Sequence, residues 1–167
     1  MINTLSSINK EVKDNAVLFV EKCEEEYREE INAIAKRIAD NDDIKIVAIA
    51  GPSGSGKTTT AHLLMKRLGV LGEKTDVVSL DDFYLPIGKM PILPDGNRDF
   101  ESVNALDLPC IERVFKSIIG TGKALLPRFD FQTKEHIDDA RLIDIGNRGI
   151  VIVEGLHALN PAVTGLV

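Results

Sequence analysis

The sequence has few or none of the residues that mark several protein classes. It contains no tryptophan, two cysteines and no apolar run close to the roughly eighteen residues that a membrane-spanning helix needs. Cys23 and Cys110 lie far apart with no second cysteine near either, so we expect buried or half-buried thiols rather than a disulfide framework or a metal site. The N-terminus lacks the basic and apolar segments of a secretory signal. We therefore expect a cytoplasmic protein with no membrane segment.

Clustered positive charge is scarce as well. The chain has 26 acidic and 20 basic residues, a formal net charge of −6. Residues 1–43 hold 11 of the acidic and 6 of the basic residues, so most of the excess lies there. A nucleic-acid groove needs clustered Lys and Arg, and we expect no nucleic-acid partner. With 167 residues, 44% of them hydrophobic, the chain can bury one core and is typical of one globular α/β domain with a modest extension.

Proline and glycine are absent from residues 5–39, where apolar residues recur every three or four positions. This pattern predicts one amphipathic helix. Its expected apolar face consists of Val12, Ala16, Val20, Cys23, Tyr27, Ile31, Ile34 and Ile38. Unbroken, it would be about 50 Å long, so part of it would project or pack on something outside this chain. We predict an N-terminal helix and linker over residues 1–43 and a separate core over residues 44–167.

Glycines are concentrated in GPSGSGKTT, residues 51–59, directly after the apolar run of residues 44–50. The spacing fits G-x-x-x-x-G-K-[ST], a phosphate-binding loop between a buried strand and a helix. Glycines let backbone N–H groups approach a triphosphate, Lys57 would reach its β- and γ-phosphates, and the Thr58 hydroxyl would bind Mg²⁺. The expected nucleotide contacts are Gly51, Ser53, Gly54, Ser55, Gly56, Lys57, Thr58 and Thr59.

The segments after this loop predict a βαβ unit, with ligands at the carboxyl ends of its strands. Residues 57–68 indicate a helix that ends near Gly69, and residues 76–80 a second strand. Asp81 and Asp82 follow that strand, where a carboxylate could bind Mg²⁺, accept a proton from a hydroxyl or simply cap a turn. Glu154 ends a further apolar strand, residues 149–154, and would reach Mg²⁺ directly or through water.

The remaining segments predict further elements of the core. Residues 86–100 contain several prolines and glycines and predict a long loop, often a lid or binding loop. Residues 107–119 predict a helix capped by Asp107, with Pro109 in its first turn and Gly120 as its stop. Residues 125–131 favour an edge strand, although their two aromatic residues beside a carboxylate could also stack on a planar ligand. Residues 140–145 predict another short strand.

Five blocks in this order, GPSGSGKTT, SLDDFY, DFESVNALD, LPRFDF and IVIVEGLHALNP, resemble the uridine kinase family of P-loop kinases, which is related to phosphoribulokinase. The resemblance implies a P-loop NTPase-type three-layer α/β sandwich with a mainly parallel sheet. It implies ATP-dependent phosphoryl transfer to the hydroxyl of a nucleoside or a related small molecule, with Lys57 on the phosphates and Asp81 as general base. Mg²⁺ would lie among Thr58, Asp81 and Glu154. The implied substrate-binding residues are Asp81, Tyr84, Phe100, Glu101, Phe129, Phe131 and Lys134.

The sequence departs from the family pattern in three respects. Lys134 stands where the family usually has a histidine that contacts the base, with His136 two residues later, so uridine specificity stays open. The long first helix and the EGLHALNP ending are similar to a branch fused to other domains, some related to threonyl-tRNA synthetase, and we expect an upstream domain or a homo-oligomer as partner. The family also continues with an arginine-bearing lid, so we expect these residues to be a nearly inactive fragment, incomplete at the C-terminus.

Two other functions stay open at this point. A nucleotide switch or GTPase would need a guanine-reading N-K-x-D sequence, which is absent from these residues. A non-catalytic ATP-binding domain that regulates a fused partner would explain Lys134 as part of a decayed site. The aromatic residues near Asp81 favour the kinase, because a hydrolase needs no stacking pocket.

Overall fold

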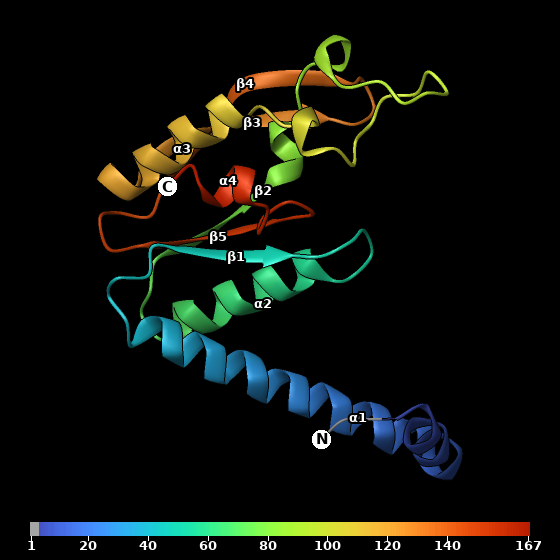
Figure 1. Ribbon diagram of the computed structural model, residues 1–167. Helices are drawn as coiled ribbons and strands as arrows, with labels where there is room; N and C mark the ends of the chain where they lie inside the picture. Colours follow the sequence, from blue (N-terminus) through green and yellow to red (C-terminus); the bar gives the residue numbers. More distant parts are fainter. Residues whose placement is uncertain (1–3) are drawn as a thin grey trace.

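The computed structural model describes residues 4–167 (Figure 1). In chain order the elements are α1 (Leu5–Ala39), β1 (Ile46–Ala50), α2 (Lys57–Val70), β2 (Thr75–Ser79), α3 (Leu108–Thr121), β3 (Lys123–Asp130), β4 (Glu135–Asp144), β5 (Ile150–Gly155) and α4 (Pro161–Thr164). Short 3₁₀ turns lie at Leu80–Phe83, Ile87–Lys89 and Val103–Ala105. Most bounds lie within a few residues of those predicted. Helix α3 continues through Gly120 because the left-handed residue that ends it is Gly122, with a φ of 72°.

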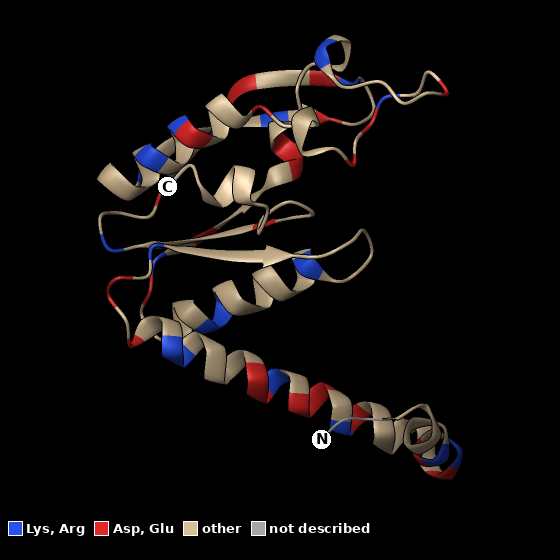
Figure 2. Ribbon diagram, viewed as in Figure 1, with Lys and Arg blue, Asp and Glu red and all other residues tan. Residues whose placement is uncertain are grey.

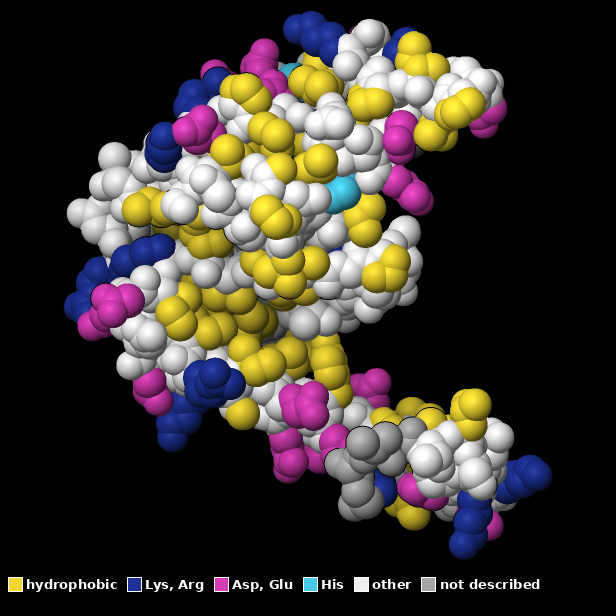
Figure 3. Space-filling view, viewed as in Figure 1, with side chains coloured by type: hydrophobic (Ala, Val, Ile, Leu, Met, Phe, Trp, Pro, Cys, Tyr) yellow, Lys and Arg dark blue, Asp and Glu magenta, His cyan; other side chains and the backbone are white. Residues whose placement is uncertain are grey.

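The central sheet is parallel and has the strand order β1-β5-β2. Ile152 of β5 pairs with Val47 of β1 on one side and with Val77 of β2 on the other. Every residue of β5 is buried, as its continuous apolar sequence predicted. Strand β1 was predicted to be equally buried but is only half-buried, because β5 is its one strand neighbour among residues 4–167. Hydrophobic side chains gather on the face around the open edge of β1 (Figure 3).

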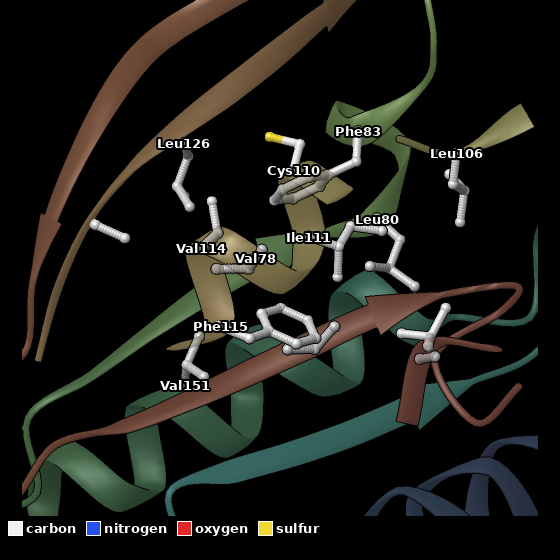
Figure 4. Packing of buried hydrophobic residues seen from close by; sticks show 14 of the residues in the cluster. Val78, Leu80, Phe83, Leu106, Cys110, Ile111, Val114, Phe115, Leu126 and Val151 are labelled. Carbon is white, nitrogen blue, oxygen red and sulfur yellow. The ribbon is translucent and has the colours of Figure 1, made fainter. Parts of the chain in front are cut away.

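Helices cover both faces of this sheet and complete the predicted three-layer α/β sandwich (Figure 1). Helix α2 lies on one face, and α3 with α4 lies on the other. Figure 4 shows Ile111, Val114 and Phe115 of α3 close to Val78 of β2 and Val151 of β5, and all five side chains are buried in one core cluster. This packing fixes the strand ends that carry the chemically active side chains.

Strands β3 and β4 form a separate two-stranded antiparallel sheet. Side chains along β3 alternate between exposed and buried over most of its length, as the sequence pattern predicted for an edge strand. The prediction was incomplete in one respect, because β3 pairs with the longer β4 and does not extend the parallel sheet. The buried residues Ala124, Leu126 and Phe129 face the core that α3 also covers.

Helix α1 spans the predicted residues but is not one continuous helix. Asn15 has φ −163° and ψ 98°, which breaks the helix, and its Oδ1 accepts a hydrogen bond from the Leu18 N–H at 3.1 Å. The first part turns back far enough for Glu11 Oε2 to lie 3.4 Å from Lys22 Nζ. No helix within residues 4–167 is long and apolar enough to cross a membrane.

Most of the apolar face predicted for α1 is exposed, because the first part of the helix extends beyond the body of the molecule (Figure 1). Only Ile31, Ala35 and Ile38 of this helix are buried, where it crosses α2. The expectation for the thiols was half right, since Cys110 is buried but Cys23 is exposed on α1.

Candidate active site

The glycine-rich loop between β1 and α2 has the backbone that an anion site requires. Gly54 and Gly56 have φ values of 73° and 84°, which other residues adopt with strain. A Cβ atom on Gly51 would lie 2.8 Å from Ser55 Oγ. Gly56 caps α2 without any side-chain hydrogen bond, so the N–H groups of the first turn remain available to a phosphate.

Lys57 is the first residue of α2, and its side chain bonds back to the backbone of the loop. Its Nζ donates a hydrogen bond to the Pro52 carbonyl at 2.9 Å. A phosphate bound in the loop would take over this ammonium group, because an anion is a stronger hydrogen-bond acceptor than a neutral carbonyl. The side chains of Ser53, Ser55, Thr58 and Thr59 are all exposed around the same turn.

Two carboxylates lie next to the loop, as predicted. Glu154 ends β5 opposite Ile49 of β1 and Ser79 of β2, and it is only 4% exposed. Its Oε1 accepts a hydrogen bond from Thr58 Oγ1 at 3.3 Å. Asp81 follows β2 in the 3₁₀ turn, which is capped by the Ser79 hydroxyl, so Asp81 is not needed as the cap.

The groups around Asp81 affect the pKa of its carboxyl in opposite directions. Partial burial raises the pKa of the Asp81 carboxyl first, and the nearby Glu154 charge raises it further, while Lys57 lowers it. A buried Glu154 beside the more exposed Asp81 makes a pair of like charges, which fits a divalent cation that prefers oxygen ligands. No cluster of three acidic, His or Cys side chains that could hold a metal occurs within residues 4–167, so Thr58, phosphate oxygens and water would complete the coordination.

Asp82 has different surroundings from those of Asp81. Burial raises the pKa of its carboxyl, and a hydrogen bond from the Phe129 backbone is the largest opposing effect. The charges of Arg141 and Arg128 also lower the pKa of Asp82. The sequence left two adjacent acids as candidates, and the structure directs Asp82 toward β3 and leaves Asp81 beside the loop.

Four aromatic rings form a cluster next to Asp81. Tyr84, Phe100, Phe129 and Phe131 have centroids 5.1 to 6.4 Å apart, mostly edge to face. Phe129 is 3% exposed and forms the base of the cluster, whereas Phe131 is 48% exposed and open to a ligand. Burial raises the pKa of Tyr84 to about 12, and the Asp81 charge is the next contribution.

Lys134 lies over the cluster, at the position where the resemblance implied a base-contacting residue. Its Nζ is 5.3 Å from the Phe100 centroid and 6.0 Å from the Phe131 centroid, which are cation–π distances. Its φ of 62° is unusual for a side chain larger than glycine, and its N–H donates to the Asp130 carbonyl at 2.7 Å. The structure thus brings together the aromatic residues and Lys134 from β3, the β3–β4 turn and two separate loops.

Two histidines near this cluster had no functional role in the sequence prediction. His136 Nδ1 lies 2.8 Å from the Tyr84 carbonyl, and His157 Nε2 lies 2.9 Å from the Glu101 carbonyl. Each contact joins residues more than fifty positions apart, so no local pattern reveals it. The one available signal was the position of His157, three residues after Glu154.

The fold and this strand edge define a P-loop nucleotide-binding protein of the α/β class. The sequence profile of the phosphoribulokinase / uridine kinase family matches residues 46–164. The chain therefore belongs to this family. The match begins after α1 and leaves this whole helix outside it.

Individual relatives agree with this assignment. The uridine kinase of Lactobacillus helveticus is 28% identical over 114 residues, 68% of this chain and 53% of the relative. The uridine kinase of Saccharomyces cerevisiae is 28% identical over 116 residues, 68% of this chain and 23% of the relative. The chain thus spans about half, or less, of the length of these curated relatives.

Solved structures show the same fold. A structure described as a possible uridine kinase from Bacillus stearothermophilus superposes with a TM-score of 0.64 at 24% identity, covering 78% of this chain and 71% of that one. A putative fructose transport system kinase from Silicibacter gives a TM-score of 0.61 at 21% identity, covering 81% of this chain and 70% of that one.

Proposed function

We propose that this site transfers a phosphoryl group from ATP to the hydroxyl of a nucleoside, uridine- or cytidine-like, or of a related small molecule. One observation carries the proposal: the aromatic cluster lies beside Asp81, at the same edge as the glycine-rich loop. A nucleotide switch needs the loop and the carboxylates but no second aromatic site. Relatives named uridine kinases support a nucleoside as the acceptor.

Each residue has a distinct role in this proposal. Lys57 and the N–H groups at the start of α2 hold the β- and γ-phosphates. Thr58, Asp81 and Glu154 hold Mg²⁺, which when bound neutralises charge on the phosphate oxygens. Asp81 accepts the proton of the attacking hydroxyl, because it follows β2 at the edge of the sheet where the loop and the aromatic cluster meet.

The acceptor side of the site supplies orientation. Tyr84, Phe100, Phe129 and Phe131 offer ring faces and edges on which a planar base can pack. Glu101 and Lys134 lie at its rim, where they contact polar groups of the acceptor. Phosphoryl transfer depends mostly on positioning and charge, so this arrangement needs no covalent intermediate.

The test compares Lys57→Ala and Asp81→Asn with wild type in the full-length protein, by calorimetry and by a phosphotransfer assay with ATP, Mg²⁺ and a nucleoside panel. Lys57→Ala should weaken ATP binding at least about tenfold, because a charged hydrogen bond to phosphate is lost. Asp81→Asn should retain nucleoside binding but lower the transfer rate by about 10² to 10⁴. Equal rates for Asp81→Asn and wild type would contradict its role as base.

The absolute rate of these 167 residues stays a prediction. We expect it to be far below about 1 s⁻¹, the low end for kinases, and a higher turnover would contradict that expectation. Nucleoside binding without turnover in the full-length protein would instead favour the alternative, an ATP-binding regulatory domain. Preference for GTP without nucleoside binding would favour a nucleotide switch.

A further inference from the structure

We propose that His157 is a positioning residue for the acceptor: its imidazole holds the Phe100–Glu101 segment against the catalytic edge of the sheet. The inference rests on the proposed function, because it concerns the acceptor half of that site. It adds a residue from the β5–α4 turn to a pocket whose other members come from β3, the 3₁₀ turn after β2 and the long loop.

Two side chains hold successive carbonyl groups of this segment. The Tyr84 hydroxyl donates to the Phe100 carbonyl at 2.8 Å, and His157 Nε2 donates to the Glu101 carbonyl at 2.9 Å. Hydrogen bonds on two neighbouring carbonyls fix both the position and the rotation of the peptide between them. The Phe100 ring and the Glu101 side chain therefore take their directions from these two contacts.

The segment needs such support because it ends a long irregular loop. Between Tyr84 and Ser102 the chain forms a short 3₁₀ turn at Ile87–Lys89 and an isolated bridge between Ile92 and Arg98. Asp99 Oδ1 accepts from the N–H groups of Glu101 and Ser102 at 3.0 and 3.1 Å, which shapes the turn locally. Local turn bonds cannot set the distance of the loop from the sheet, whereas a side chain from the turn at the end of β5 can.

His157 is itself held firmly at the end of β5. Its carbonyl accepts from the Asn160 N–H at 2.9 Å, and Asn160 Oδ1 caps α4 by accepting from the Ala162 N–H at 2.9 Å. The turn starts at Gly155, where a Cβ atom would lie 2.8 Å from Leu80 Cβ, so the backbone packs closely on the 3₁₀ turn that carries Asp81. Because the turn that carries His157 is fixed to the sheet, a hydrogen bond from His157 also fixes the loop relative to the sheet.

His157 also lies near the reacting groups. His157 is three residues after Glu154, in a turn whose first residue, Gly155, packs against Leu80 next to Asp81. One side chain thus connects the strand end that carries Glu154 with the loop that carries Glu101. Loss of the hydrogen bond between His157 and Glu101 should let the Phe100–Glu101 segment move, while the glycine-rich loop keeps its structure.

The experiment uses His157→Ala, His157→Gln and the matched control Leu159→Ala, in which a 63% exposed side chain of the same turn is removed. Calorimetry measures uridine binding in the presence of Mg²⁺ and an unreactive ATP analogue, and separately the binding of that analogue. Glutamine is the conservative variant because its amide nitrogen can replace Nε2 as the donor. Thermal unfolding of each variant shows whether the fold is retained.

We expect His157→Ala to weaken uridine binding roughly tenfold, with the dissociation constant of the ATP analogue changed less than about twofold. His157→Gln should recover most of the affinity, and Leu159→Ala should match wild type. Unchanged uridine binding in His157→Ala would overturn the inference, as would parallel weakening of both ligands without rescue by glutamine. Binding of the ATP analogue but of no nucleoside by the wild-type protein would contradict the proposed function itself, and with it this inference.

Discussion

At the scale of single residues, Tyr84 connects several segments of the acceptor side of the site. Its hydroxyl holds the Phe100 carbonyl, its ring contacts three phenylalanine rings, and its own carbonyl lies 2.8 Å from His136 Nδ1. Burial followed by the Asp81 charge keeps the phenol protonated well above its ordinary pKa of 10.0. The neutral phenol is the form that donates to the loop.

This shift predicts a pH dependence of stability. The folded pKa of Tyr84 is about 12 against 10.0 ordinarily, so its contribution is fully present below pH 10 and is lost as the pH rises through about 12. The loss at pH 12 is on the order of 2 kcal/mol, because the unfolded chain releases the proton first. Denaturant unfolding at increasing pH should show a shallower decline for Tyr84→Phe than for wild type.

Tyr27→Phe provides the control, because Tyr27 is the other tyrosine of the chain and lies outside the pocket. This variant should keep the alkaline decline attributed to Tyr84. An identical decline in wild type and Tyr84→Phe would contradict the assignment.

Single residues of the site differ in how far the sequence predicted them. Spacing alone placed Lys57 and Thr58 at the start of α2, since the loop, the helix start and the proposed phosphate contacts are all local. Glu154 could be placed at the same edge because parallel strands end together. The contact of His157 with Glu101 was out of reach, because it depends on how a long loop returns to the sheet.

At the scale of elements, the second half of α1 is an outer layer on α2. Ile31, Ala35 and Ile38 pack in one cluster with Ala61, Leu64 and Leu68 of α2. The Tyr27 hydroxyl lies 2.7 Å from Thr60 Oγ1, two residues after Thr58. The predicted division of the chain at residue 43 stays a proposal, and these contacts join the two sides of that division.

Packing at this crossing predicts a clear difference between two variants of α1. Ile31→Ala should lower the free energy of unfolding by about 2–5 kcal/mol, because it leaves a cavity where the side chain is 4% exposed. Val20→Ala removes a 57% exposed side chain from the same helix and should change stability by less than about 0.5 kcal/mol. Urea unfolding measures both. Equal stability of the two variants would show that α1 does not support the core.

Helices and strands were predicted well where the local sequence pattern determines them. They were predicted less well where contacts with other elements determine them. The period of apolar residues gave both ends of α1, but not the break at Asn15, because asparagine is tolerated within helices as well as at their starts. Alternation along β3 predicted a strand. It could not predict the partner strand. The edge of the parallel sheet and strand β4 were both possible partners for β3, and the local sequence does not distinguish between them.

At the scale of the whole molecule, the proposed function depends on which side chains lie at the carboxyl ends of the strands. The carboxyl ends of β1, β5 and β2 meet at one edge, and the separate β3–β4 sheet brings its aromatic residues to the same side. Figure 2 shows Lys and Arg spread along the chain and acidic residues at the turn that follows β2. The predicted sandwich was confirmed because buried parallel strands and amphipathic helices leave few alternative arrangements.

The most direct test of the central claim is a binding titration with a bisubstrate ligand, adenosine and uridine joined through a chain of phosphates. If the loop at Lys57 and the cluster around Phe131 form one site, this ligand should bind at least about tenfold more tightly than ATP, since two contacts are joined in one molecule. Uridine should compete with it, and Lys57→Ala should remove most of the gain. Binding no tighter than that of ATP, with no competition by uridine, would contradict the claim.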